Sequence, residues 1–166
     1  MKFFRHRHIC LPALVLAISV AGCSSADDDA TAAVPSPDAA VVKLCRNLDG
    51  ALPKKLDGQG RTDPEPASAL TAGWGSPAII LRCGVPRPPK MIDPKVAEGR
   101  DENAVAGGVD GVDWLQEKAD DGAFRFTTAS RVAYVEVVVP AERDSTSALV
   151  DLAPAIKSAV PKGIAD

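Results

Sequence analysis

The residues best suited to acid–base catalysis in this chain are carboxylates, because both histidines, His6 and His8, lie close to its start. Beyond them, a Ser–His or Cys–His nucleophile system and a histidine-ligated zinc site have no histidine to use. Five acidic residues of the second half are the candidates: Asp110, Asp113, Asp120, Asp121 and Glu136. Glycoside hydrolysis needs two carboxylates that face each other across a cleft, and the spacing of these five selects no pair.

Short glycine and aspartate motifs could bind a cation or a phosphate, but each is incomplete. Asp110-Gly111-Val112-Asp113 and Asp120-Asp121-Gly122 lack the spacing of an EF-hand and are typical of turns. Gly107-Gly108 is not followed by the Lys-Ser or Lys-Thr of a phosphate-binding loop. The run from Asp27 to Asp29 could hold a cation, although a solvated acidic run is the simpler interpretation. The sequence therefore predicts no metal site and no cofactor.

The first 22 residues have the pattern of an export signal. A basic start is followed by an uncharged apolar stretch, residues 9–21, which is too short to span a bilayer. It ends in Val20-Ala21-Gly22-Cys23, which resembles the lipobox of bacterial lipoproteins. That resemblance implies cleavage between Gly22 and Cys23 and attachment of lipid to the Cys23 sulfur. Ordinary secretion with Cys23 as an incidental residue is the alternative, and both interpretations predict export.

The cysteine count supports the lipobox interpretation. Of four cysteines, Cys10 leaves with the signal peptide, and an odd number in an oxidising compartment is unfavourable. If Cys23 carries lipid, Cys45 and Cys83 remain as one disulfide pair. Closing that loop would stabilise the fold by about 4 kcal/mol in the chain-entropy model. A metal site is the alternative for two cysteines, but the mature chain offers no further soft ligand.

The charge of the chain limits its partners. There are 19 basic and 22 acidic residues, and removal of Lys2, Arg5 and Arg7 with the signal peptide lowers the net charge from −3 to −6. An acidic domain has no electrostatic attraction for nucleic acid or for an anionic membrane surface. We therefore expect no nucleic-acid partner. We expect membrane association through the lipid on Cys23, together with a possible protein partner in the envelope.

The sequence divides into a signal peptide at 1–22, a disordered tether at 23–37 and a single α+β domain at 38–166. The tether has few apolar residues to bury. A first helix should begin at Ser36-Pro37-Asp38, carry Cys45 on its apolar face and end at Gly50. A last helix should begin at Asp144-Ser145, with Pro154 kinking it or dividing it.

The strands are expected in the second half and beside Cys83. Residues 112–116, 124–128 and 134–139 alternate and predict an antiparallel meander. Residues 79–83 form a further apolar strand, preceded by a helical turn at 67–72, and residues 91–106 show no clear pattern. The predicted fold is a two-layer α+β domain, with a small antiparallel sheet of about four strands packed by an N-terminal and a C-terminal helix.

Arg82 and Glu136 are charges inside apolar strands, where a partner is expected. Alternation places both on the face of the sheet that looks away from the helices, provided that their strands are adjacent and in register. A structural cross-strand ion pair is the preferred interpretation. The alternative is that this polar spot, with Ile80, Tyr134 and Val138 around it, is part of a binding surface.

Several segments together resemble a known family. They are Trp74-Gly75-Ser76-Pro77-Ala78-Ile79-Ile80-Leu81-Arg82-Cys83-Gly84, Val112-Asp113-Trp114, Phe124-Arg125-Phe126-Thr127-Thr128, Arg131 and Val135-Glu136-Val137. In this order they resemble an actinobacterial lipoprotein family known as domain of unknown function three-five-one-five. The resemblance runs from the lipobox cysteine to the end of the chain and includes the paired cysteines. It implies exported, lipid-anchored proteins of high-GC Gram-positive bacteria, and it implies no reaction.

The preferred function is that of a lipid-anchored protein on the extracytoplasmic face of the bacterial cell membrane, with an accessory or interaction role in the envelope and no catalysis. A small-ligand-binding lipoprotein is one alternative, although solute receptors usually have two lobes. A carboxylate-based envelope hydrolase is the other. A deep polar cleft would favour a ligand or substrate, and a flat or apolar patch would favour an interaction role.

Overall fold

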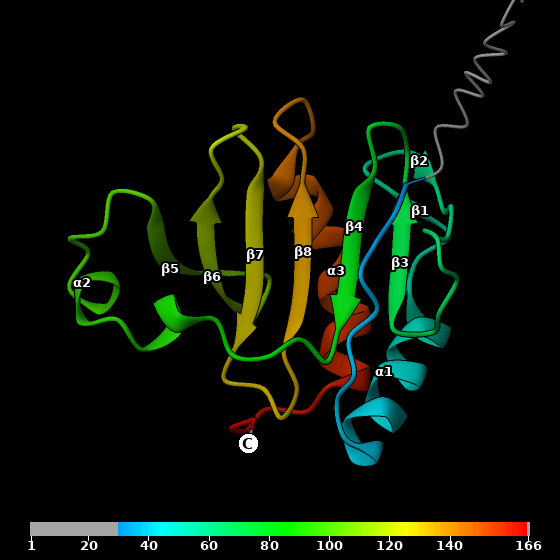
Figure 1. Cartoon of the computed structure of the whole chain (residues 1–166), viewed down its shortest axis with the longest axis horizontal. Coiled ribbons are helices and arrows are strands. Elements are labelled where there is room, and N and C mark those ends of the chain that lie inside the picture. Colours follow the sequence, from blue (N-terminus) through cyan, green and yellow to red (C-terminus); the bar gives the residue numbers. More distant parts are fainter. Residues whose placement is uncertain (1–29, 166) are drawn as a thin grey trace, which may run out of the picture.

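A computed structural model of the chain describes residues 30–165, and within them six strands form one antiparallel sheet in the order β3-β4-β8-β7-β6-β5 (Figure 1). The strands are β3 (Thr71–Trp74), β4 (Ile79–Cys83), β5 (Ala104–Val109), β6 (Val112–Lys118), β7 (Phe124–Ala129) and β8 (Val135–Val139). A separate hairpin joins β1 (Lys55–Leu56) to β2 (Gln59–Gly60). The predicted α+β class and the meander β6-β7-β8 beside β4 are confirmed, but the expected sheet of about four strands is too small.

The two strands that the sequence did not predict, β3 and β5, are the edges of the sheet. β3 is buried at every position, so its residues do not alternate, and the helical turn expected at 67–72 is wrong. β5 reads Ala-Val-Ala-Gly-Gly-Val, and small residues have weak strand propensity. The pairing of β5 with β6 is instead determined by the turn between them. Asp110 and Gly111 both have positive φ angles, 46° and 76°, as a two-residue type I′ hairpin requires.

Two helices, α1 (Ala39–Ala51) and α3 (Ser145–Ala159), cover one face of the sheet (Figure 1). Asp38 rather than Ser36 is the N-cap of α1, because its carboxylate accepts hydrogen bonds from the N–H groups of Ala40 and Val41. Pro154 does not divide α3. It lies on the exposed side of the helix, where a carbonyl that loses its intrahelical partner can be solvated.

The main core lies between these helices and the sheet. Alternate residues of β4 and β8 are buried there as predicted, together with the apolar stripe of α3. On the opposite face, the short helices η1 (Pro89–Ile92) and α2 (Pro94–Ala97) lie near β5 and β6. They close a smaller cluster in which Val96, Ala104 and Leu115 are buried and Met91 packs beside them.

Residues 30–37 pack against the domain, so the prediction of a disordered tether over 23–37 is wrong for this part. The N–H of Ala32 donates to the carbonyl of Glu65 at 3.0 Å, and the N–H of Glu65 donates to the carbonyl of Ala30 at 2.9 Å. The segment crosses the sheet face opposite the helices, beside β3 and β4 (Figure 1). Main-chain pairing holds it although it has little apolar surface. The predicted signal peptide, the cleavage site at Gly22, the lipid site Cys23 and the run Asp27–Asp29 lie outside the described residues.

Candidate functional site

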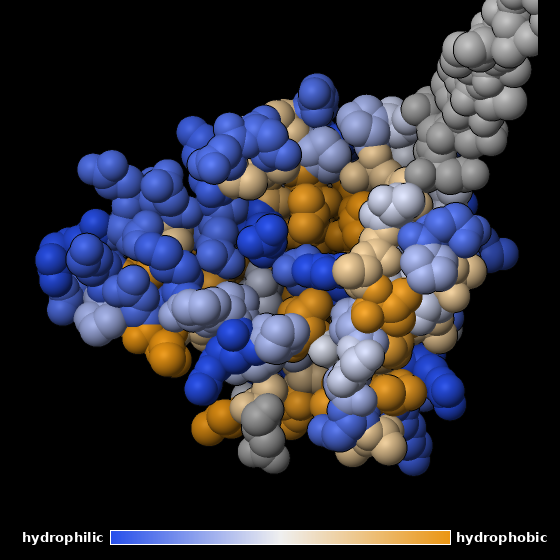
Figure 2. All heavy atoms as spheres, in the orientation of Figure 1, coloured by the Kyte–Doolittle hydropathy of each residue, from blue (hydrophilic) through white to orange (hydrophobic). Residues whose placement is uncertain are grey.

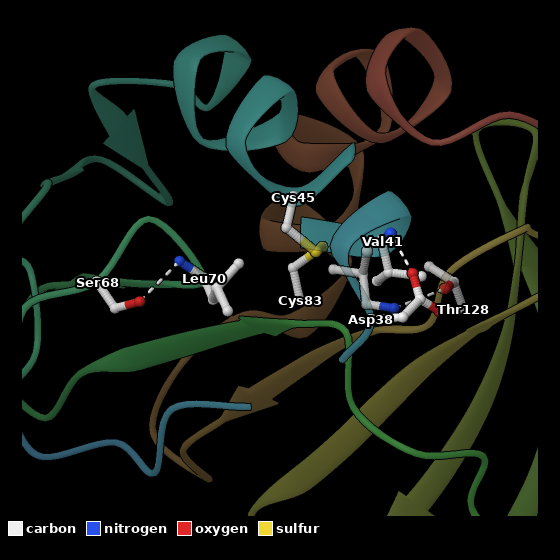
Figure 3. The surroundings of a disulfide bond; sticks show 8 residues. Asp38, Val41, Cys45, Ser68, Leu70, Cys83 and Thr128 are labelled. Carbon is white, nitrogen blue, oxygen red and sulfur yellow. Dashed lines mark hydrogen bonds between the residues drawn. A yellow bond between two sulfur atoms is a disulfide. The ribbon is translucent and has the colours of Figure 1, made fainter. Parts of the chain in front are cut away.

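The predicted disulfide is present and joins α1 to the end of β4. Cys45 and Cys83 are each 1% exposed, their Cα atoms are 5.5 Å apart, and they are 38 residues apart in the sequence. Figure 3 shows Cys45 reaching from α1 to Cys83, with Val41 one turn earlier on the helix. The bond therefore ties the first turns of α1 to the point where β4 leaves the sheet.

A groove of about 640 Å³ opens at this same end of the fold. Its walls are the start of α1 with the segment before it, the loop after β4, the loop between β7 and β8, and the C-terminal residues. The lining residues used below are Pro37, Asp38, Val41, Gly84, Arg87 and Tyr134. Cys45 and Cys83 do not line the groove, but each directly follows or precedes a lining residue, Leu44 or Gly84, so the disulfide restrains the distance between these two walls.

The charged residues of the groove differ in whether they already have hydrogen-bond or ion-pair partners within the domain. The Asp38 carboxylate caps α1. Arg87 is exposed and makes no hydrogen bond or ion pair with any described residue. The carbonyl of Tyr134 accepts from the N–H of Gly84 at 2.8 Å, which joins two walls. The groove thus combines mainly apolar walls with an exposed cation, an arrangement that suits an apolar group carrying a negative charge.

Arg82 and Glu136 are cross-strand partners, as strand alternation predicts. Arg82 Nε donates to Glu136 Oε1 at 2.8 Å, and Arg125 Nε of β7 lies 3.4 Å from Glu136 Oε2. The side chain of Glu136 is only 8% exposed, against 28% for Arg82 and 47% for Arg125. Two arginines therefore neutralise one nearly buried carboxylate, which leaves this cluster with a net charge of +1 and no free base.

The sequence interpretation missed Arg125, although the signal was present. Arg125 lies between Phe124 and Phe126, so alternation places it on the face that carries Glu136. Figure 2 shows this face of the molecule, where hydrophilic atoms cover the side of β5 to β7 and apolar atoms gather near β4 and β8. The predicted surface site at Arg82 and Glu136 is therefore a half-buried ion pair on a mixed surface.

The other candidate carboxylates are not brought together. Asp110, in the turn between β5 and β6, pairs with Lys157 at 2.9 Å. Asp121, in the turn between β6 and β7, accepts from the N–H of Ala123 at 3.0 Å. These turns lie at opposite ends of β6, and Asp113 is exposed on that strand. Over residues 30–165, no group of three or more His, Cys, Asp or Glu residues could hold a metal ion.

Two ion-pair clusters outside the groove contain side chains with shifted pKa values. Burial lowers the pKa of Arg61, but hydrogen bonds with Asp49 and Asp63 outweigh it, so the pKa is raised. The hydrogen bond between Lys90 and Asp101 raises the pKa of Lys90 and lowers that of Asp101. Both clusters join loops to the domain, Arg61 to the end of α1 and Lys90 to the segment before β5. Their positions indicate a structural role.

Comparison with protein families gives one match. The model of a family described as a protein of unknown function (DUF3515) matches residues 8–164. The chain belongs to this family. In this DUF3515 member, the segment Trp74–Gly84 comprises the turn and second strand of the β3–β4 hairpin, and it ends at the disulfide and the rim of the groove. Comparisons with curated proteins and with solved structures found no match.

No helix within residues 30–165 has both the length and the apolar character that a membrane crossing requires.

Proposed function

We propose that this DUF3515 protein is an exported lipoprotein of the bacterial cell envelope, held on the extracytoplasmic face of the membrane by lipid on Cys23, with an interaction role. The observation that carries the proposal is the buried Cys45–Cys83 disulfide. Disulfides form and persist in oxidising compartments. Export brings the chain to such a compartment, and the leader that ends in Val20-Ala21-Gly22-Cys23 supplies the route.

The groove supports the interaction role. It is held open between covalently joined walls and carries the exposed cation Arg87, so it offers a rigid surface to a partner. A rigid apolar surface binds with a small entropic cost, because few groups need to be ordered on binding. The candidate carboxylates support a hydrolase less well, because their turns lie at opposite ends of β6.

The anchor is tested by labelling the full chain with palmitate in cells that process lipoproteins. Wild-type protein should incorporate the label and fractionate with membranes, and Cys23→Ala should do neither. Cys10→Ala is the matched control, because this leader cysteine is removed on processing and its loss should leave labelling unchanged. Absence of label from the wild-type protein, or equal label in Cys23→Ala, would refute the lipid anchor. Cytoplasmic retention of the wild-type chain would refute export as well.

A second candidate function is binding of a small ligand. The groove of about 640 Å³ favours it, since ligand pockets typically measure about 300–1,000 Å³. The test is titration with 1-anilinonaphthalene-8-sulfonate, a small aromatic anion that fluoresces in apolar sites. Arg87→Ala should weaken binding about tenfold by removing the cation, whereas Arg100→Ala, an exposed arginine outside the groove, should not. Equal binding by all three proteins would contradict a ligand site in the groove.

A further inference from the structure

The two edges of the sheet are protected to different extents. Beside β3, the N–H of Thr62 donates to the carbonyl of Gly73 at 2.8 Å, and Arg61 pairs with Trp74. Beside β5, no main-chain group of residues 105–109 bonds to any described residue outside the β5–β6 ladder. One edge is therefore paired with the chain itself, whereas at the other, where α2 packs beside Ala104 at the start of β5, residues 105–109 present N–H and C=O groups without such a partner.

β5 also lacks the features that usually prevent edge strands from pairing. Natural edges carry lysine, proline or a bulge, but β5 reads Ala-Val-Ala-Gly-Gly-Val and pairs with β6 without interruption. Val105 is 49% exposed on this strand, and it belongs to the small set of large apolar side chains on the surface of the described residues. An uncharged, exposed edge of this kind is a template for another strand.

Beside Gly107 the surface has an apolar hollow of about 110 Å³, and the chain's own Val105 is one of the residues at its border. Gly107 is the cross-strand partner of Trp114, and a Cβ added at Gly107 would have nothing within 4 Å. The φ angle of Gly107 is not in the positive range, so backbone conformation does not require glycine there. Trp114 lines the hollow, is 2% exposed, and its Nε1–H has no partner among residues 30–165. The hollow is thus an open apolar surface in which a side chain from outside the chain has room beside Gly107.

We propose that β5 pairs antiparallel with β5 of a second copy of this chain, about a two-fold axis at Ala106. Residues directly opposite in an antiparallel pair share one face of the sheet. With Ala106 opposite Ala106 of the second copy, Val105 of each copy lies opposite Gly107 of the other. Each exposed valine then fills the hollow beside the other copy's Gly107.

The strand that pairs with β5 belongs to a second copy because the exposed side chain of Val105 and the hollow beside Gly107 lie on the same strand, two residues apart. A two-fold interface needs this self-complementarity, in which residue i contacts residue j in both directions. Registers centred on residue 107 or 108 do not place Val105 opposite the hollow. A register centred on 108 would use Val109, which is packed against its own core and is not free to project. The contact is small, so the pairing is expected to be weak and transient.

Cross-linking of a cysteine on the axis is the first test. In the paired state the two residues at position 106 have Cα atoms about 4.5–5.5 Å apart, within the disulfide range. Ala106→Cys in the exported full chain should give a reducible dimer that contains a 106–106 peptide. Val150→Cys, an exposed position on α3, is the matched control and should give none above the wild-type level. A dimer equally abundant in both variants, no dimer at all, or linkage of position 106 only to a different protein would overturn the proposal.

A charge pair tests the register. Combined with Ala106→Cys, either Val105→Lys or Gly107→Glu should lower the rate of dimer formation about tenfold or more, because each places a charge opposite an apolar or empty position. Co-expression of these two chains should restore mixed dimers, because the introduced lysine of one copy then faces the introduced glutamate of the other. Both positions are exposed, and an intact Cys45–Cys83 bond verifies folding. If co-expression did not restore dimer formation, or if neither charge slowed it, the register would be overturned.

Discussion

Gly84 lies directly against Pro37 at the rim of the groove, where a Cβ added at Gly84 would be 2.5 Å from the Pro37 Cγ. The φ angle of Gly84 is +84°, so this residue satisfies both a backbone conformation and a close contact. Its N–H also donates to the carbonyl of Tyr134. The loop after β4, the segment before α1 and the loop before β8 therefore meet at one residue.

Gly84→Ala should destabilise the fold by about 2–4 kcal/mol, because the φ penalty and the clash with Pro37 add. Gly58→Ala is the matched control. Its φ is +72°, but a Cβ there would meet nothing within 4 Å, so it should cost about 1–2 kcal/mol. Urea unfolding of both variants measures the difference. Equal losses would mean that Pro37 yields without cost and does not constrain the groove.

Replacement of both cysteines, Cys45→Ala with Cys83→Ala, should lower the free energy of unfolding by about 4 kcal/mol for a loop of 38 residues in the chain-entropy model. Guanidinium unfolding measures this, and Cys10→Ala should have no effect on the processed protein. The double variant should also bind the groove probe more weakly, since the covalent link between its walls is lost. Two free thiols in exported wild-type protein would contradict the pairing.

Glu136→Gln should cost about 1–2 kcal/mol, because it weakens the charged hydrogen bonds of a nearly buried group and removes the negative charge that Arg82 and Arg125 share. Glu142→Gln is the control, because Glu142 is exposed and pairs with no described cation, and should change stability by less than about 0.5 kcal/mol. If the Arg82–Glu136 pair has only a structural role, palmitate labelling, dimer formation and probe binding should all remain unchanged. A selective loss of probe binding at full stability would instead support a binding role for the pair.

The Lys90–Asp101 pair predicts how stability depends on pH. The pKa of Asp101 is lowered, mainly by the hydrogen bond from Lys90, so its contribution is present above the unfolded value of about 3.9 and is lost as pH falls through the folded value. The pKa of Lys90 is raised by the same bond. Its contribution is complete below about 10.4 and is lost as pH rises through the folded value.

Asp101→Asn should therefore be less stable than the wild-type protein at neutral pH, and the difference should shrink in acid below about pH 4. Thermal unfolding of both proteins across that range measures it. Asp120→Asn, in an exposed turn, serves as the control and should parallel the wild-type curve. A constant difference between Asp101→Asn and wild type at every pH would show that the carboxylate charge is not what matters.

Sequence periodicity predicted the elements whose residues alternate or follow a helical stripe. The valines of β8 and the stripe containing Cys45 are examples, and the Arg82–Glu136 register followed from them. It could not predict β3 or β5, because one is buried on both faces and the other consists of small residues. Residues 30–37 were missed for a related reason, since the main chain holds them. The groove was not predicted because it is formed by the ends of segments far apart in the sequence.

The course of residues 30–37 would limit how the molecule can face a membrane. The segment begins at Ala30, beside Glu65 near the β1–β2 hairpin, and ends at Pro37 in the groove, at the other end of the sheet (Figure 1). With lipid on Cys23, as proposed, seven residues lead from the anchor to Ala30, a reach of at most about 25 Å. The hairpin end would then face the bilayer, and the groove would open outward. Molecules that bind in the groove would then reach it from the cell wall and not from the bilayer.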